Sequence, residues 1–155
     1  FNAYGPTEAT VCASMHLYRQ NDLACNIGKP LSGVKILVLN QHLQLNPVGV
    51  TGEIYLAGSG VAQGYIHNPE LTERKFLRHP WCEPDGRLYR TADRGRYLDD
   101  GSIEYRGRCD NQIKIRGFRV ELDEIEHHLR ENPCVKQAAV TIQRTDNEAE
   151  IIAFI

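Results

Sequence analysis

Seven residues near the start of the chain, Asn2 to Glu8 with the sequence NAYGPTE, combine side chains that could together bind a nucleotide. The face of Tyr4 can stack on a purine ring, and the Gly-Pro turn exposes backbone to a ligand. The hydroxyl of Thr7 can bind a phosphate oxygen, and the carboxylate of Glu8 can hold magnesium. The stretch therefore predicts a nucleotide pocket, although an ordinary turn that leads into a helix, with Thr7 as its cap, would use the same residues.

A second group of candidate residues lies in LYRTADRGRYLDDGSIEYRGRCDNQIKIRG, residues 88–117. The carboxylate of Asp93 accepts two hydrogen bonds, and a ribose diol offers two donors. Arg108, fifteen positions later, could reach the same sugar or a phosphate with its fork of donors. In the alternative, Arg108 forms a surface ion pair with Asp110 or Glu104.

Other motifs argue against other chemistries. The glycine-rich GEIYLAGSGVAQGY, residues 52–65, has neither the dinucleotide-binding spacing nor the ending of a phosphate loop, so it predicts a strand followed by a tight turn. His127 and His128 are adjacent on a predicted helix and point about 100° apart, which disfavours a shared metal. Cys12 has no neighbouring base and is interpreted as a small apolar wall residue.

Strands that are rich in branched residues dominate the elements that must position these side chains. They are predicted at residues 34–39, 52–58, 96–105, 113–116, 138–143 and 149–155. The third is a hairpin, because Asp99, Asp100 and Gly101 tolerate the turn between its arms. One short, peripheral helix begins after Asn68, and a second covers residues 121–132 and ends at Pro133.

The order of the elements changes after about residue 107, from strands and loops to a hairpin, a helix and two strands. We therefore expect an α+β chain with a domain boundary near Arg108 to Asp110.

Composition limits the classes of partner. The chain has 155 residues, a formal net charge of −2 and no cluster of basic residues, so nucleic acid and anionic membranes are not expected. Its five cysteines form no C-x-x-C pair and are interpreted as reduced thiols of a cytoplasmic protein. The first residue, Phe1, and the apolar strand that stops at Ile155 suggest a piece of a longer protein.

The stretches NAYGPTE, GEIYLAGSGVAQGY, YRTAD and GRCDNQIKIRGFRVELDEIE together resemble the adenylation domains of non-ribosomal peptide synthetases. These domains belong to the adenylate-forming superfamily, with acyl-CoA synthetases and luciferases. The resemblance spans most of Asn2 to Glu126. It implies that residues 1–109 are the end of the large, here mostly β, N-terminal domain. It also implies that residues 110–155 begin the small, mobile α+β C-terminal domain, with a hinge near Asp110.

The implied activity is a two-step ligase reaction. ATP and an amino acid would give an aminoacyl-AMP and pyrophosphate, and the acyl group would pass to the phosphopantetheine thiol of a peptidyl carrier protein domain. Neighbouring synthetase modules are further implied partners, and magnesium is an implied cofactor.

The resemblance also assigns roles to individual residues. Thr7 and Glu8 would serve catalysis by contacting the phosphates and the magnesium, respectively. The implied ATP-binding residues are Asn2, Tyr4, Gly5, Thr7, Asp93, Tyr105 and Arg108, where Asn2 and Tyr4 contact adenine, Asp93 and Arg108 reach the ribose and Tyr105 packs on the other side of the nucleotide. The implied amino-acid pocket contains Ala3, Val11 and Cys12, which favours a hydrophobic substrate such as phenylalanine. Asp110 matches the hinge, and the loop from Lys114 to Gly117 would face the site during thioester formation.

The chain departs from the family pattern at several points. Ala92 replaces a usual glycine and would cost about 1 kcal/mol or more if the position needs a positive φ; Gln63 replaces a usual arginine. The upstream phosphate-binding loop and the C-terminal lysine are not in the sequence, so we expect the isolated chain to be inactive. A fragment of an acyl-CoA or aryl-CoA ligase, and a non-catalytic nucleotide-binding or interaction module, are the alternatives.

Overall fold

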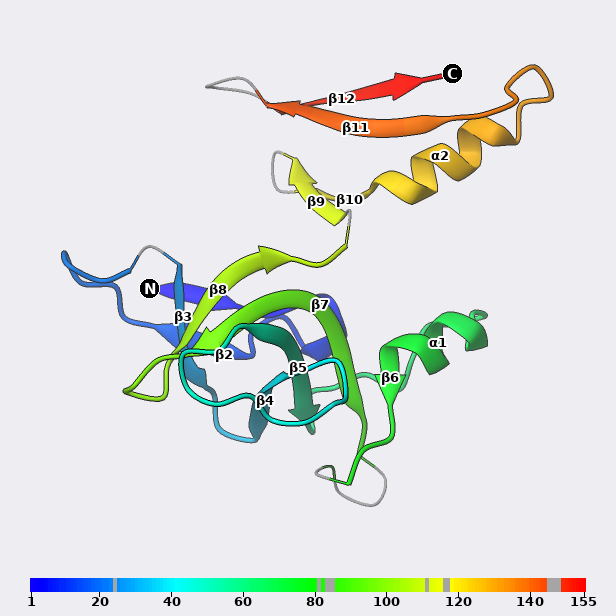
Figure 1. Cartoon of the computed structure of the whole chain (residues 1–155). Coiled ribbons are helices and arrows are strands. Elements are labelled where there is room, and N and C mark those ends of the chain that lie inside the picture. The colour runs from blue at the N-terminus through cyan, green and yellow to red at the C-terminus, as the bar shows by residue number, and fades with distance from the viewer. Residues whose placement is uncertain (24, 81, 83–85, 111, 116–117, 145–148) are drawn as a thin grey trace. The chain divides into compact units, whose positions relative to one another are not determined.

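The structure, a computed structural model, describes residues 1–23, 25–80, 82, 86–110, 112–115, 118–144 and 149–155. The chain forms two compact units, Phe1–Cys109 and Asp110–Ile155 (Figure 1). Strands occur in both units, and each unit has one α-helix among its described residues. The expected α+β class is confirmed. The hinge at Asp110 and the domains assigned to the two units stay predictions.

The first unit is built on one antiparallel sheet. Its strands are β1 (Asn2–Tyr4), β2 (Ser14–His16), β3 (Asn26–Pro30), β4 (Val34–Leu39), β5 (Gly52–Gly58), β6 (Phe76–Leu77), β7 (Leu88–Tyr97) and β8 (Ile103–Arg108). They are ordered β1-β2-β3-β8-β7-β5-β4, and β6 also pairs with β7. β7 is central and pairs with β5 on one side and with β8 and β6 on the other, since its Tyr89 pairs both with Leu56 of β5 and with Phe76 of β6.

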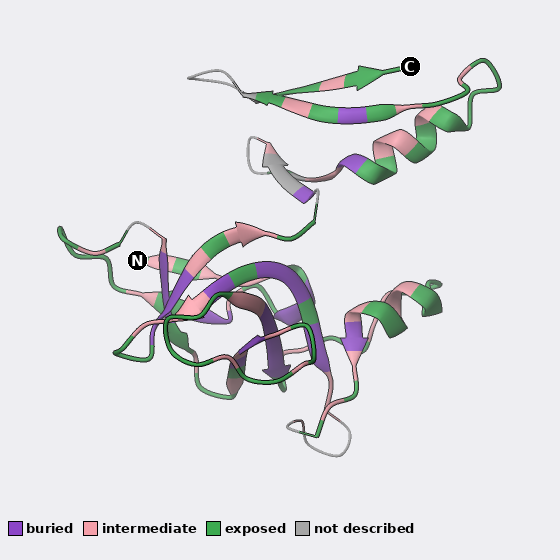
Figure 2. Cartoon of the chain, in the orientation of Figure 1, coloured by how far each residue is buried: buried purple, intermediate pink, exposed green. Residues whose placement is uncertain are grey.

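The core explains why β5 reads as a continuous apolar run. Successive side chains of a strand point to opposite faces. Ile54 and Leu56 join one buried cluster, whereas Tyr55 and Ala57 join a second one. Figure 2 shows the resulting buried stretches along β5 and β7. The bounds predicted for β4 and β5 are confirmed, since a strand covered on both faces leaves little ambiguity in its apolar limits.

The predicted hairpin is confirmed, but its first arm is longer than expected. Gly101 has a φ of +80° at the turn, and the amide of Ser102 donates to a carboxylate oxygen of Asp100 at 2.9 Å. β7 begins at Leu88 rather than at Arg96, because Leu88 and Tyr89 are buried and pair with β6.

The helical segments of the first unit differ in how they begin. In α1 (Pro69–Lys75), the amide of Leu71 donates to the side chain of Asn68 at 3.0 Å, and none of the helix residues is buried, as expected for a capped peripheral helix. The 3₁₀ turn η1 (Thr7–Ala9) has Pro6 at its cap position and no side-chain cap bond. The interpretation of Thr7 as a helix cap is therefore wrong.

The second unit follows the predicted order of hairpin, helix and two strands. It contains β9 (Gln112–Ile115) paired with β10 (Phe118–Glu121), the helix α2 (Leu122–Arg130), and β11 (Ala139–Arg144) paired with β12 (Ala149–Phe154). The amide of Val140 in β11 donates to the carboxylate of Glu126 in α2 at 2.9 Å. Neither described helix is long and apolar enough to cross a membrane.

Candidate functional site

Tyr4, Asp93 and Arg108, which lie far apart in the sequence, form one hydrogen-bonded cluster. The hydroxyl of Tyr4 donates to Oδ2 of Asp93 at 2.7 Å, and the guanidinium of Arg108 donates to Oδ1 at 2.5 Å. A second guanidinium nitrogen donates to the main-chain oxygen of Thr91 at 3.0 Å. The pairing of β7 with β8 sets Asp93 opposite Arg108, and β1 supplies Tyr4. The structure thus brings together three of the predicted ATP-binding residues.

The carboxylate of Asp93 at the centre of this cluster is buried and is paired with a cation. Asp93 is only 6% exposed, and a buried carboxylate needs a cationic or hydrogen-bonding partner. Burial, followed by the charge of Asp93 and the hydrogen bond to it, raises the pKa of Tyr4 well above its ordinary value. Tyr4 is therefore a neutral donor at physiological pH. A carboxylate offers about four lone-pair directions, so these two protein donors do not by themselves exhaust its capacity to accept bonds from a diol.

Glu104, the alternative partner considered for Arg108, belongs to a different ion cluster. Its carboxylate accepts from Arg96 at 2.6 Å and lies 3.1 Å from a guanidinium nitrogen of Arg106. Arg108 instead pairs with the carboxylate that the resemblance assigns to the ribose. A contact between Arg108 and the ribose stays a prediction.

Tyr105, also in β8, lies beside Tyr4. Their ring centroids are 6.4 Å apart and the ring planes are inclined by 45°. Because the rings are not parallel, one planar base cannot stack squarely on both in this arrangement. A nucleotide-contacting role for Tyr105 stays a prediction.

Two further residues of NAYGPTE make structural contacts. The side-chain amide of Asn2 donates to the main-chain oxygen of Asn26 at 2.7 Å, which joins β1 to β3. A Cβ atom at Gly5 would lie 2.5 Å from the main-chain oxygen of Val11. Glycine is thus needed there for the close approach of the following loop, and the contacts of both residues with ATP stay predictions.

Thr7 and Glu8 lie in the 3₁₀ turn that follows. Glu8 is only 8% exposed, and its Oε1 accepts a hydrogen bond from the hydroxyl of Tyr65 at 2.7 Å. Its main-chain oxygen accepts from the amide of Ala62 at 2.9 Å. The carboxylate is therefore fixed from the glycine-rich segment that follows β5, a partner that the sequence did not suggest.

Glu8 is a single carboxylate, which suits a magnesium ion that is also bound by phosphates better than a metal bound by protein side chains alone. Within the described ranges, no three His, Cys, Asp or Glu side chains gather into a metal-binding group. Mg²⁺ is commonly bound through one or two carboxylates together with substrate phosphates. A single hydrogen-bonded carboxylate fits that arrangement.

The residues assigned to the amino-acid pocket lie close to these elements. Ala3 is an exposed residue of β1, and Val11 is 75% exposed with a φ of +67°. Cys12 is half-buried, and its thiol donates to the main-chain oxygen of Ser14 at 3.5 Å. A hydrophobic specificity for this surface stays a prediction.

The hinge residues fall at the limit of what the structure describes. The carboxylate of Asp110 accepts from the amide of Gln112 at 3.3 Å. The backbone of Lys114 lies in β9 opposite Arg119. Gly117 lies outside the described residues, so the predicted thioester loop is only partly covered.

Ala92 adopts the positive φ for which the sequence predicts an energetic cost. Its φ is +62° in the middle of β7, and the residue is 6% exposed. Its main-chain oxygen accepts from the amide of Cys109 at 2.8 Å. The left-handed backbone accompanies a register shift between Asp93 and Gly95 and thereby sets the position of Asp93.

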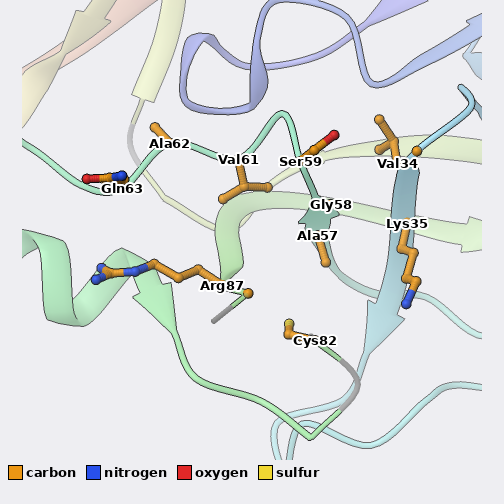
Figure 3. Close-up of a pocket in the computed structure, with 12 residues that line it drawn as sticks. Val34, Lys35, Ala57, Gly58, Ser59, Val61, Ala62, Gln63, Cys82 and Arg87 are labelled. Atoms are coloured by element: carbon orange, nitrogen blue, oxygen red, sulfur yellow. The ribbon is translucent and has the colours of Figure 1, made fainter. Parts of the chain in front are cut away.

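A cavity of about 690 Å³ lies elsewhere in the first unit (Figure 3). Lys35, Cys82 and Arg87 are among the residues that line it. The lining also includes backbone from the ends of β4 and β5. None of the predicted site residues lines this cavity, so it is separate from the Tyr4, Asp93 and Arg108 cluster.

Comparison with known proteins gives this arrangement a family context. The profile of the family described as "AMP-binding enzyme" matches residues 1–66. A plipastatin synthase of Bacillus subtilis (strain 168) is 47% identical over 158 residues, which cover 99% of this chain but 6% of that protein. Bacitracin synthase 3 of Bacillus licheniformis is 48% identical over 140 residues, which cover 90% of this chain and 2% of its own length. The chain thus spans a small part of the length of these relatives.

Solved structures agree in fold as well as in sequence. An artificially fused adenylation-PCP di-domain from Klebsiella oxytoca, NpsA-ThdA, has a TM-score of 0.82 and 36% identity over 99% of this chain and 29% of its own. A four-domain non-ribosomal peptide synthetase bound to AMP and glycine has a TM-score of 0.64 and 40% identity, over 98% of this chain and 12% of its own. The sequence and the fold together match the C-terminal portion of an adenylation domain of the non-ribosomal peptide synthetase type, and residues 1–66 match the AMP-binding enzyme family.

Proposed function

We propose that the chain supplies part of the nucleotide site of an enzyme that activates an amino acid with ATP and transfers it to a carrier thiol. The observation that carries this proposal is the junction of Tyr4, Asp93 and Arg108, because it brings three separate motifs to one buried carboxylate. The peptide-synthetase relatives support amino-acid activation over an acyl-CoA or aryl-CoA ligase, which is kept as the alternative.

In this proposal, Asp93 accepts hydrogen bonds from the ribose hydroxyls. Tyr4 and Arg108 hold its carboxylate in place, so little reorganisation is needed when the nucleotide arrives. The face of Tyr4 and the amide of Asn2 supply contacts to adenine. Because these groups are already ordered before the nucleotide binds, less conformational entropy is lost on binding.

The phosphates are assigned to the segment that contains Thr7 and Glu8. The hydroxyl of Thr7 would donate to a phosphate oxygen, and the carboxylate of Glu8 would hold magnesium together with the phosphates. When bound, the ion offsets the charge that develops as pyrophosphate departs. Glu8 is suited to this task because its position is fixed by Tyr65 and by the amide of Ala62.

The second half-reaction would use phosphopantetheine on a peptidyl carrier domain. Support comes from the similarity to NpsA-ThdA, in which an adenylation part is fused to a PCP part. We propose that Asp110 is the hinge, that the loop from Lys114 to Gly117 serves thioester formation, and that neighbouring synthetase modules and a cytoplasmic location complete the setting. Residues 110–155 would then belong to the mobile domain of the parent enzyme.

The test is exchange of labelled pyrophosphate into ATP, measured for each proteinogenic amino acid. It is run on this chain and on a complete adenylation domain that contains it. We expect exchange by the complete domain with a hydrophobic amino acid, and none by the 155-residue chain alone. Absence of amino-acid-dependent exchange by the complete domain would contradict the proposed function, whereas exchange by the short chain would contradict only its expected inactivity.

A further inference from the structure

The segment that follows β5 donates hydrogen bonds both to the side chain and to the main chain of Glu8. The hydroxyl of Tyr65 donates to Oε1 at 2.7 Å, and the amide of Ala62 donates to the main-chain oxygen at 2.9 Å. Just after the 3₁₀ turn that contains Glu8, the hydroxyl of Thr10 donates to the main-chain oxygen of Gly60 at 2.7 Å. These contacts connect NAYGPTE with the glycine-rich motif, for which the proposed function has no other use.

Tyr65 is held rigidly enough to orient its partner. Its ring meets the ring of Phe76 edge-on, with centroids 5.4 Å apart, and Phe76 in turn lies 5.0 Å from Tyr89. The amide of Tyr65 donates to the hydroxyl of Thr72 at 2.9 Å. The packed ring thus holds the hydroxyl of Tyr65 in a fixed position beside the carboxylate of Glu8.

Gly64 explains how the chain reaches this position. It has a φ of +151°, and a Cβ atom there would lie 2.4 Å from Cγ2 of Thr72. A larger residue would push the segment away from α1 and move the ring of Tyr65. The glycine of the AQGY sequence is therefore required by the path that carries Tyr65 to the carboxylate.

A carboxylate that binds magnesium gains from such an arrangement. Mg²⁺ demands near-ideal octahedral geometry, and a carboxylate that can rotate freely presents its oxygens in many directions. Hydrogen bonds to a metal-binding carboxylate fix its orientation, and their loss typically lowers metal affinity or activity 10- to 100-fold. We propose that Tyr65 is a positioning residue that orients the Glu8 carboxylate for the magnesium complex of ATP. This inference rests on the proposed function.

The test compares Tyr65→Phe with a matched variant, Tyr55→Phe. Both changes remove only a hydroxyl group, and both break a tyrosine to glutamate bond in the same unit, since Tyr55 donates to Glu53 at 3.1 Å. Glu53, however, is paired with Arg90 and not with the residues around Glu8. The control therefore reproduces the chemical change without touching the proposed magnesium carboxylate.

Two readouts are taken on the complete adenylation domain. Binding of Mn²⁺, a spectroscopic substitute for Mg²⁺, is measured by electron paramagnetic resonance in the presence of ATP. The magnesium concentration for half-maximal pyrophosphate exchange is measured in parallel. For Tyr65→Phe we expect about tenfold weaker metal binding and a matching rise in the magnesium requirement, with an unchanged KM for the amino acid. For Tyr55→Phe we expect no change.

A third comparison separates positioning from a loss of fold. In a domain that carries Glu8→Gln, the further change Tyr65→Phe should have no additional effect on metal binding. If Tyr65 acts only by orienting the Glu8 carboxylate, its hydroxyl has no effect once that carboxylate is gone. Equal magnesium requirements for Tyr65→Phe and Tyr55→Phe, or an undiminished effect in the Glu8→Gln background, would overturn the positioning role. A wild-type domain without any ATP-dependent metal binding or exchange would overturn the proposed function as well.

Discussion

Replacement of Ala92 by glycine tests whether the left-handed backbone at this position in β7 lowers the free energy of unfolding. A left-handed conformation costs an L-residue roughly 1–2 kcal/mol, and Ala92 has a φ of +62°. The change also removes a buried methyl group, which costs about 0.8 kcal/mol, and loosens the unfolded chain, which costs about 0.4–1 kcal/mol. These opposing contributions nearly cancel, so Ala92→Gly should leave the free energy of unfolding almost unchanged.

Ala57→Gly provides the matched control. Ala57 is 3% exposed in β5 and is not among the positive-φ residues. The same loss of a methyl group and the same gain in chain entropy therefore destabilise this variant by roughly 1–2 kcal/mol, with no strain to relieve.

Urea denaturation of the chain at 25 °C measures both changes. The denaturation midpoint of Ala57→Gly should fall, whereas that of Ala92→Gly should stay near the wild-type value, with similar slopes. Equal losses of stability in the two variants would refute the reasoning, because they would show that the backbone at Ala92 carries no penalty that glycine can remove.

Three further changes test other parts of the structure. Tyr4→Phe should lower the free energy of unfolding by about 2 kcal/mol, because it deprives the buried carboxylate of Asp93 of a donor at 2.7 Å; a thermal melt checks this, and an unchanged melting temperature would contradict it. Gly5→Ala should cost roughly 1–3 kcal/mol by overpacking, since its Cβ would lie 2.5 Å from a main-chain oxygen; a urea midpoint equal to that of the wild type would argue against this contact. The hydrogen bond that His128 donates to Glu131, together with the charge of Glu131, raises the pKa of His128, so this pair contributes stability below the ordinary histidine pKa and loses it as the pH rises through the raised value. In Glu131→Gln, an NMR titration should show a lower pKa for His128, and an unshifted titration would rule the pair out.

Local signals in the sequence are sufficient for the strands with uninterrupted apolar runs. The bounds of β4 and β5 are predicted to the residue. Each strand carries an apolar run, residues 36–39 and 54–57, whose side chains join buried clusters on both faces. The sequence does not predict β2 and β3. Their sequences, SMH and NIGKP, carry little strand propensity, and their pairing depends on partners that are distant in the chain.

The candidate site shows the same division between local and long-range information. Asp93 and Arg108 flank a recognisable hairpin, so their proximity can be foreseen. Their junction with Tyr4 cannot, since it depends on the order of the strands within the sheet. The contact between Tyr65 and Glu8 likewise joins residues that are 57 positions apart, and no periodicity or spacing points to it.

From the sequence, strain at Ala92 is expected only if the backbone there has a positive φ. The resemblance indicates that glycine is usual there, and glycine commonly marks a positive φ. The sequence alone cannot establish which backbone conformation the alanine adopts. The structure places the residue in the left-handed region.

Asp93→Asn tests the central claim most directly, because the proposed function depends on this carboxylate as the acceptor for ribose. Asp100→Asn is the matched control, since Asp100 also accepts hydrogen bonds but lies in the hairpin turn. Pyrophosphate exchange by the complete adenylation domain gives the KM for ATP in each variant. We expect Asp93→Asn to raise this KM about tenfold or more, with Asp100→Asn unchanged. A KM for ATP that is equal in both variants and the wild type would contradict the nucleotide site described here.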